Sequence, residues 1–251
     1  MLFRSYNKST DAYCYIGTEK PNHDVVIVGW DDSYSKDNFN TDLEGDGAFI
    51  CQNSWGDNFG ENGFFYISYY DTNIGTHNVV YTDIENTDNY DHIYQSDLCG
   101  WVGQLGYNKD SIYGANVFTA EGNETLKAAS FYATGKDSQY ELYVVRQFED
   151  ETSLEKMIPV ASGKLGNAGY YTVDFNQGIE VDAGERYAVV LYIITPGSVH
   201  PMAIEYAADE ATENVDLDDG ESYISANGSK WVSVDTVEKS NLCIKAFSDN
   251  R

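Results

Sequence analysis

Histidine is the side chain that most readily acts as a general base near neutral pH, and the chain contains four. His23 comes directly before the apolar run Asp24–Trp30, and Asn53 ends a second apolar run, Gly47–Asn53. If the two runs pair as antiparallel strands, His23 lies next to Asn53. The Asn carboxamide oxygen can then accept the imidazole N–H and leave the other ring nitrogen free for a nucleophile. Trp55 could lie over this hydrogen bond and exclude water.

The elements that must position these residues are predicted to be β-strands. A third apolar run, Gly63–Tyr69, follows the first two, and the polar residues 31–46 predict a loop. Residues 83–91 are polar and rich in turn-forming residues, so we expect a domain boundary there. Many short strands follow, which predicts a mainly β fold with a β-sandwich or jelly roll. The strands predicted beyond the boundary are Ala115–Thr119, Leu126–Tyr132, Tyr140–Arg146, Tyr170–Phe175, Arg186–Ile194, Met202–Tyr206, Ser222–Ser225 and Leu242–Phe247.

The charge of the chain excludes several classes of partner. The 251 residues include 15 Lys+Arg and 41 Asp+Glu, a formal net charge of −26. Residues 1–90 hold 4 basic and 15 acidic side chains and residues 91–251 hold 11 and 26, so both halves are acidic. Nucleic acid and anionic lipid are therefore not expected as partners. No apolar run is long enough for a transmembrane segment, and residues 1–20 lack the apolar stretch of a secretion signal.

Three linked motifs carry a family resemblance. The segment NHDVVIVGW around His23 is followed by GAFICQNSWG around Asn53 and then by ENGFFYIS. Together they resemble the C-terminal half of a papain-like (C1 family) cysteine peptidase, over a domain of residues 1–85. The resemblance implies that His23 is the catalytic base and Asn53 its orienting partner. It also implies that Trp55 is the shielding indole and that Asn22 lines the primed side of the cleft.

Two features depart from the family pattern. Phe59 stands where the family usually has Trp, a change that should not harm the chemistry. The larger departure concerns the nucleophile, because papain-like enzymes carry a C-G-[SA]-C-[WY] segment about 130 residues or more before the histidine. Here 22 residues precede His23, and neither that segment nor an upstream Gln for the oxyanion hole is found. Cys14 lies in a strand-like stretch rather than at a helix N-terminus, and Cys51 is expected in the core.

We therefore expect this chain to be the C-terminal portion of a longer peptidase, truncated or processed, and inactive alone. The mechanism implied by the resemblance is a Cys/His pair that attacks a peptide carbonyl through an acyl-thioester intermediate. The missing N-terminal half would be joined in cis or supplied as a partner chain.

The second predicted domain, residues 91–248, resembles the lectin-like module found after bacterial papain-type catalytic domains. The resemblance rests on the turn-and-strand segments 220–231 and 241–247. Such a module would bind a glycan or anchor the peptidase at a cell-wall surface. The candidates for exposed aromatic residues that stack on sugar rings are Trp101, Tyr107, Tyr113 and Trp231, with Trp101 and Trp231 as the main candidates. The alternative is that these aromatic side chains pack within the sandwich.

The remaining histidines, cysteines and acidic loops predict no further chemistry. The histidines 77, 92 and 200 are expected to be surface or capping residues, and the absence of a CxxC pair makes a zinc site improbable. Cys99 and Cys243 are expected to be free thiols rather than a disulfide. The loop 42–47 only superficially matches a calcium loop, because Asn53 stands where a bidentate Glu is needed. No metal and no cofactor are predicted.

The main functional hypothesis is a secreted or cell-surface bacterial cysteine peptidase that acts on proteins or peptides and is represented here by its His/Asn half and a lectin-like domain. The first alternative is a non-catalytic carbohydrate-binding or surface-binding protein with a relic peptidase half. A second alternative is a split enzyme, in which a separate chain supplies the cysteine.

Overall fold

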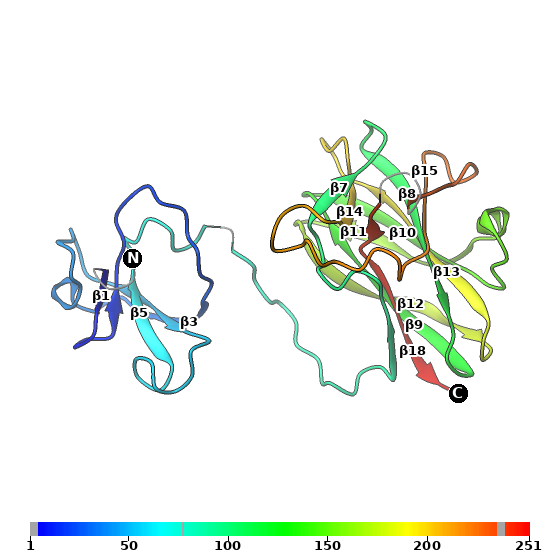
Figure 1. Cartoon of the computed structure of the whole chain (residues 1–251). Coiled ribbons are helices and arrows are strands. Elements are labelled where there is room, and N and C mark those ends of the chain that lie inside the picture. Colours follow the sequence, from blue (N-terminus) through cyan, green and yellow to red (C-terminus); the bar gives the residue numbers. More distant parts are fainter. Residues whose placement is uncertain (1–4, 77, 235–238) are drawn as a thin grey trace. The chain divides into compact units, whose positions relative to one another are not determined.

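The computed structural model describes residues 5–76, 78–234 and 239–251 of the chain, and they are mainly β as predicted. The chain divides into two compact units, residues 1–81 and 82–251 (Figure 1). The division falls close to the expected boundary at residues 83–91. His77 lies outside the described residues.

The first unit contains a five-stranded sheet in the order β1-β2-β5-β4-β3. Strands β3 and β4 are antiparallel, with Val26 opposite Gln52, as the placement of His23 beside Asn53 requires. The segment between them is a loop that holds one short 3₁₀ helix, η1 (Lys36–Asn38). The strands are β1 (Tyr6–Asn7), β2 (Ala12–Tyr13), β3 (Val26–Asp31), β4 (Ala48–Gln52) and β5 (Phe64–Ser68).

Strand β3 lies at the edge of this sheet and is exposed on both of its faces. Alternate residues of a strand point to opposite faces, so a half-buried strand exposes only every second side chain. In β3 the exposed fractions of the successive residues Val26, Ile27 and Val28 are 54%, 39% and 51%, and that of Trp30 is 69%. The residues of β3 are as apolar as those of a strand buried in the middle of a sheet. Within the described residues, however, no other element covers β3.

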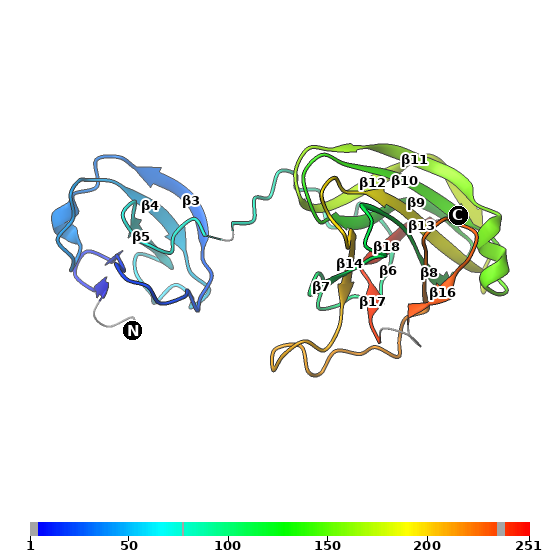
Figure 2. The same cartoon turned by 90° about the horizontal axis from the view of Figure 1, so that it is seen from above.

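The second unit contains three sheets (Figure 2). Their orders are β11-β10-β13-β8-β15-β16 for the six-stranded sheet, β12-β9-β18-β6 for the four-stranded sheet and β17-β14-β7 for the smallest. A second 3₁₀ helix, η2 (Glu151–Glu155), connects β10 to β11. The strands are β6 (His92–Tyr94), β7 (Gly103–Leu105), β8 (Ser111–Thr119), β9 (Glu124–Ala133), β10 (Ser138–Val145), β11 (Ile158–Leu165), β12 (Gly169–Val181), β13 (Arg186–Ile194), β14 (Met202–Glu205), β15 (Ser222–Ser225), β16 (Val232–Ser233), β17 (Asn241–Leu242) and β18 (Ile244–Asn250).

The core of the second unit lies between its two larger sheets. Leu142 and Tyr187 from the six-stranded sheet join Phe131 and Ile244 from the four-stranded sheet in one buried cluster. Each of these side chains alternates along its strand with residues on the outer face, which is the pattern of a β-sandwich. The predicted sandwich is therefore confirmed.

Candidate functional site

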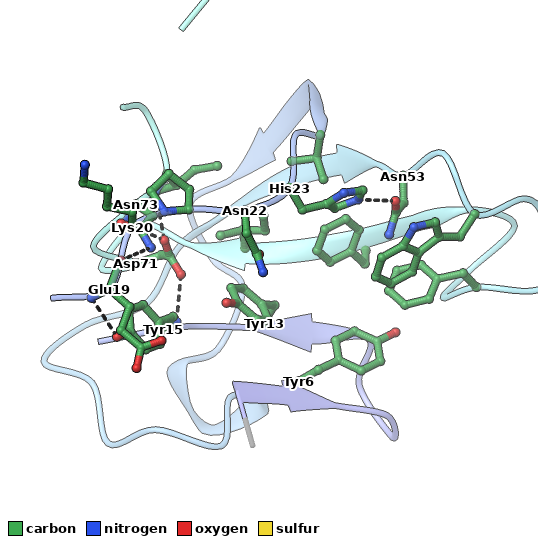
Figure 3. A pocket seen from close by; sticks show the side chains of 17 residues that line it. Tyr6, Tyr13, Tyr15, Glu19, Lys20, Asn22, His23, Asn53, Asp71 and Asn73 are labelled. Carbon is green, nitrogen blue, oxygen red and sulfur yellow. Dashed lines mark hydrogen bonds between the residues drawn. The ribbon is translucent and has the colours of Figure 1, made fainter. Parts of the chain in front are cut away.

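The structure brings His23 and Asn53 together. The imidazole Nε2 of His23 lies 2.9 Å from Oδ1 of Asn53, whose oxygen also accepts the backbone N–H of Ser54 at 2.8 Å (Figure 3). Because a carboxamide oxygen only accepts hydrogen bonds, Nε2 is the nitrogen that carries the proton. Nδ1 is left with its lone pair and is the atom that can take a proton from another group.

The position of Asn53 follows from the strands and glycines around it. Asn53 directly follows β4, is 8% exposed and donates its backbone N–H to the carbonyl of Gly63 at 3.0 Å. The loop to β5 turns back through Gly56, Gly60 and Gly63, which all have positive φ angles. At Gly60 a Cβ atom would lie 2.1 Å from the carbonyl oxygen of Phe64, so only glycine fits.

Aromatic side chains pack against one face of the His23 ring. The ring of Trp55 stacks on that of His23 with centroids 4.9 Å apart and an interplanar angle of 25°. Phe59 meets Trp55 edge to face at 5.0 Å, and Tyr6 stacks on Phe59 at 5.1 Å. Phe59, which replaces the family's Trp, therefore still supports the indole. Sequence reasoning missed Tyr6, whose only signal is an aromatic side chain within a short strand.

A groove runs from the histidine along this side of the first unit. His23 and Asn53 line one end, Asn22 and Tyr13 lie midway, and the other end contains Asp71 (Figure 3). The carboxylate of Asp71 accepts backbone N–H groups from residues 15, 73 and 74 at 2.7–2.8 Å, so its acceptors are used within the fold. Asn22 is exposed and borders the groove beside His23.

The cysteines of the first unit are buried away from this groove. Cys14 and Cys51 are both 0% exposed, and neither lines the groove. Burial raises the pKa of Cys14 to about 11 and that of Cys51 to about 12, so both stay as thiols near neutral pH. Among the described residues that line the groove, none is a cysteine, serine or threonine.

The aromatic candidates of the second unit do not share one environment. Trp101 is 38% exposed. Tyr107, Tyr113 and Trp231 are all partly buried, as the alternative of packing within the sandwich predicts. Tyr107 packs against the main core, whereas Tyr113 and Trp231 join a second apolar cluster on the outer face of the six-stranded sheet. The sequence could not show this cluster, since its members come from distant strands.

The other histidines and cysteines of the second unit make local contacts. Nε2 of His92 lies 2.9 Å from Oδ1 of Asn250, and this hydrogen bond, with nearby acidic groups, raises the pKa of His92. The backbone N–H of His200 donates to the hydroxyl of Ser198. Cys99 is exposed, Cys243 is buried, and both are free thiols.

Comparison with known families identifies both units. The model of the lectin-like domain family matches residues 93–248, which is more than half of the chain. The chain belongs to the lectin-like domain family. The model of the papain family of cysteine proteases matches residues 1–84, so the family predicted from the motifs around His23 and Asn53 is confirmed as well. No curated protein matches the chain.

Two solved structures resemble this papain-family and lectin-like chain. One is a variant of the clostridial cysteine protease Cwp84 after propeptide cleavage, with a TM-score of 0.81 and 27% identity over 100% of this chain and 64% of that chain. The other contains the cysteine protease and lectin-like domains of Cwp84, a surface layer associated protein of Clostridium difficile. It has a TM-score of 0.75 and 28% identity over 98% of this chain and 56% of that one. This chain thus spans less than two thirds of either.

Among the described residues, no helix is long and apolar enough to cross a membrane.

Proposed function

We propose that the first unit supplies the histidine and asparagine of a papain-like cysteine peptidase active site, and that the N-terminal half of the catalytic domain supplies the nucleophile. The observation that carries this proposal is the His23–Asn53 hydrogen bond beneath Trp55, which leaves Nδ1 of His23 free. The substrates would be proteins or peptides.

In this mechanism Nδ1 of His23 takes the proton of a cysteine thiol, and the thiolate attacks the peptide carbonyl. The imidazolium then gives its proton to the departing amine, which leaves an acyl-thioester. Water, activated by the same histidine, hydrolyses the thioester and regenerates the thiol. Asn53 keeps the imidazole oriented, Trp55 keeps water from their hydrogen bond, and Asn22 contacts the primed side of the substrate.

Two features of the first unit support an additional catalytic half. The described residues that line the groove include no cysteine, serine or threonine, although the imidazole of His23 is oriented to take a proton from such a side chain. The exposed apolar strand β3 also offers a surface that a further part of a catalytic domain would bury. The half would be joined to this chain or supplied by a separate one.

The second unit would bind a glycan and hold the peptidase near its substrate at a cell surface. Membership of the lectin-like family supports this role. The description of Cwp84 as a surface layer associated protein supports a secreted or cell-surface location.

The test is reconstitution of the chain with the N-terminal half of a papain-like catalytic domain, followed by a peptidase assay. The chain alone should give no turnover, whereas the reconstituted protein should cleave a fluorogenic peptide. His23→Ala should lower kcat/KM by roughly a thousandfold or more, because proton transfer is lost. Asn53→Ala should cost about ten- to hundredfold, because it only orients the base.

His200→Ala in the second unit is the matched control and should leave kcat/KM unchanged. A reconstituted protein that folds but shows no activity, or one in which His23→Ala retains full activity, would contradict the proposal. The first of these outcomes would favour the non-catalytic alternative.

A further inference from the structure

An exposed row of aromatic side chains lies on the outer face of the four-stranded sheet. Tyr170 of β12 pairs with Tyr132 of β9, and their ring centroids are 5.0 Å apart. Trp101 extends the row, with its centroid 5.8 Å from that of Tyr132. Trp101 and Tyr170 are 38% and 44% exposed, so the row is open to solvent at both ends.

Polar side chains form a second row beside the aromatic one. Ser130 of β9 pairs with Thr172 on one side and with Lys245 on the other, two positions from Tyr132 and Tyr170 and thus on the same face. The ammonium group of Lys245 forms a salt bridge with the buried carboxylate of Asp97 at 3.1 Å and donates to Oε1 of Gln95 at 2.6 Å. Ser130 is fully buried, so Thr172 and Gln95 are the exposed members of this row. The hydroxyl groups of Ser130 and Tyr170 lie 2.5 Å apart and tie the two rows together.

The loop that carries Trp101 is fixed on both sides of the indole. The backbone N–H of Cys99 donates to the carboxylate of Glu205 at 2.7 Å, and that of Val102 donates to the carbonyl of Ile204 at 3.0 Å. Gly100 has a φ of +68°, and a Cβ there would lie 3.0 Å from the hydroxyl oxygen of Tyr132. The chain thus holds a solvent-exposed Trp in one position, which lowers the entropy cost of binding a ligand there.

We propose that this face binds an uncharged, extended glycan chain, with Trp101, Tyr132 and Tyr170 stacking on sugar rings and the exposed side chains of Thr172 and Gln95 hydrogen-bonding to hydroxyl groups. The inference rests on the proposed function and assigns its glycan site. Aromatic rings cover the apolar C–H faces of pyranoses, while hydroxyl and amide groups are suited to their rims. Residues 91–251 hold 26 acidic and 11 basic side chains, which disfavours an anionic polymer.

The aromatic residues on the opposite side of the sandwich are less available. Tyr113 is covered on one face by Tyr192, at 4.2 Å between centroids. On the other side, Gly228 approaches so closely that a Cβ would lie 3.2 Å from the Tyr113 ring. Trp231 meets the edge of Tyr113 at 6.2 Å within the second apolar cluster. These contacts account for the aromatic side chains there through packing.

The test is calorimetric titration of the full chain with two uncharged β-1,4-linked hexasaccharides, chitohexaose and cellohexaose. Saturable binding to at least one is expected, with none to a heparin hexasaccharide. Trp101→Ala and Tyr170→Ala should each raise Kd about tenfold or more, as for a buried aromatic anchor. Trp101→Phe should raise Kd less than Trp101→Ala does. If circular dichroism shows that Trp101→Ala is unfolded, Trp101→Phe becomes the deciding variant.

Tyr192→Ala, on the outer face of the other large sheet, is the matched control and should bind as the unchanged chain does. Binding that survives both Trp101→Ala and Tyr170→Ala, or that is lost in Tyr192→Ala alone, would overturn the site while leaving a glycan-binding function. Absence of binding to both uncharged hexasaccharides would overturn the site and the glycan part of the proposed function. The peptidase part would be untouched, because its reconstitution assay is independent.

Discussion

The imidazole of His23 is held by residues that come from two separate segments, the loop after β4 and strand β1. Asn53 bonds one edge of the ring and Trp55 covers one face. Trp55 in turn rests on Phe59, and Phe59 rests on Tyr6. Position 59 carries Phe where the family usually has Trp. The ring of Tyr6 packs beside the ring of Phe59. The orientation of the base therefore depends on a side chain that does not touch it.

Tyr6→Ala should loosen the His23–Asn53 hydrogen bond without removing either partner. Loss of one aromatic pair costs about 1 kcal/mol, which corresponds to roughly fivefold faster solvent exchange of the His23 Nε2 proton. The measurement is exchange of this proton by nitrogen-15 NMR of the chain. Tyr6→Phe is the control, because it keeps the ring and loses only the hydrogen bond to Asp11. Equal exchange rates in Tyr6→Ala and the unchanged chain would show that Tyr6 has no positioning role.

The proximity of His23 and Asn53 was predictable because it needs only two neighbouring strands and a loop. Their pairing is fixed by apolar runs that sequence alone reveals. The contact of Tyr6 with Phe59 was not predictable, because a distant segment must return to the sheet to make it. The packing of Trp231 was foreseen as an alternative, but its neighbours were not predictable, since they come from several strands of a sheet whose order the sequence does not show.

At the level of the elements, long apolar strands were predicted well, whereas several short or polar strands were missed. Arg186–Ile194 has the predicted bounds because its run is apolar throughout and bounded by turn residues. Strand β11, Ile158–Leu165, was not predicted, because it contains Pro and Gly and lies at the sheet edge, where both are tolerated. The predicted strand Leu242–Phe247 is divided at Cys243 between two sheets.

Glu124 joins three strands of the four-stranded sheet through one buried carboxylate. It lies in β9 and accepts hydrogen bonds from Tyr94 of β6 at 2.8 and 2.9 Å and from Ser248 of β18 at 2.6 Å. His92 is a further neighbour at 4.0 Å. Burial by itself would raise the pKa of Glu124. The hydrogen bonds from Ser248, Tyr94 and the backbone of Gly122 outweigh burial, and the pKa is lowered.

This lowered pKa makes part of the stability of the second unit depend on pH. The contribution is present above the unfolded pKa of Glu, about 4.3, and is lost as the pH falls through the lower folded value. Glu124→Gln should reduce the free energy of unfolding at pH 7 by about 1–3 kcal/mol and flatten its decline between about pH 5 and pH 3. Urea unfolding followed by circular dichroism measures both. Exposed Glu210 provides the control Glu210→Gln, and equal pH slopes in Glu124→Gln and the unchanged chain would refute the prediction.

At the scale of the whole molecule, acidic charge is spread over both units. The net charge of −26 comes from 41 acidic and 15 basic side chains, and each unit has an excess of acid. Charge of one sign keeps copies of a protein apart but also repels within each folded unit. The two units have different proposed functions, peptidase activity for the first and glycan binding for the second. Both units nevertheless have an acidic surface.

Screening this repulsion should stabilise the chain. Raising NaCl from about 10 mM to 150 mM shortens the screening length from about 30 Å to about 8 Å, and the thermal midpoint should rise by a few degrees. The midpoint is measured by circular dichroism at pH 7. Choline chloride at the same ionic strength should have the same effect, since screening does not depend on the identity of the cation. A constant or falling midpoint would contradict the expectation.

Salt should also promote assembly of the isolated chain, because strand β3 leaves an apolar sheet edge exposed. Val26, Ile27, Val28 and Trp30 leave this edge apolar on both faces, with backbone groups that a second strand can join. Mutual repulsion between copies holds such edges apart at low ionic strength. The salt that strengthens each folded unit therefore also lowers the barrier to edge-to-edge assembly. Solubility and fold stability of this chain should therefore have different optimal salt concentrations.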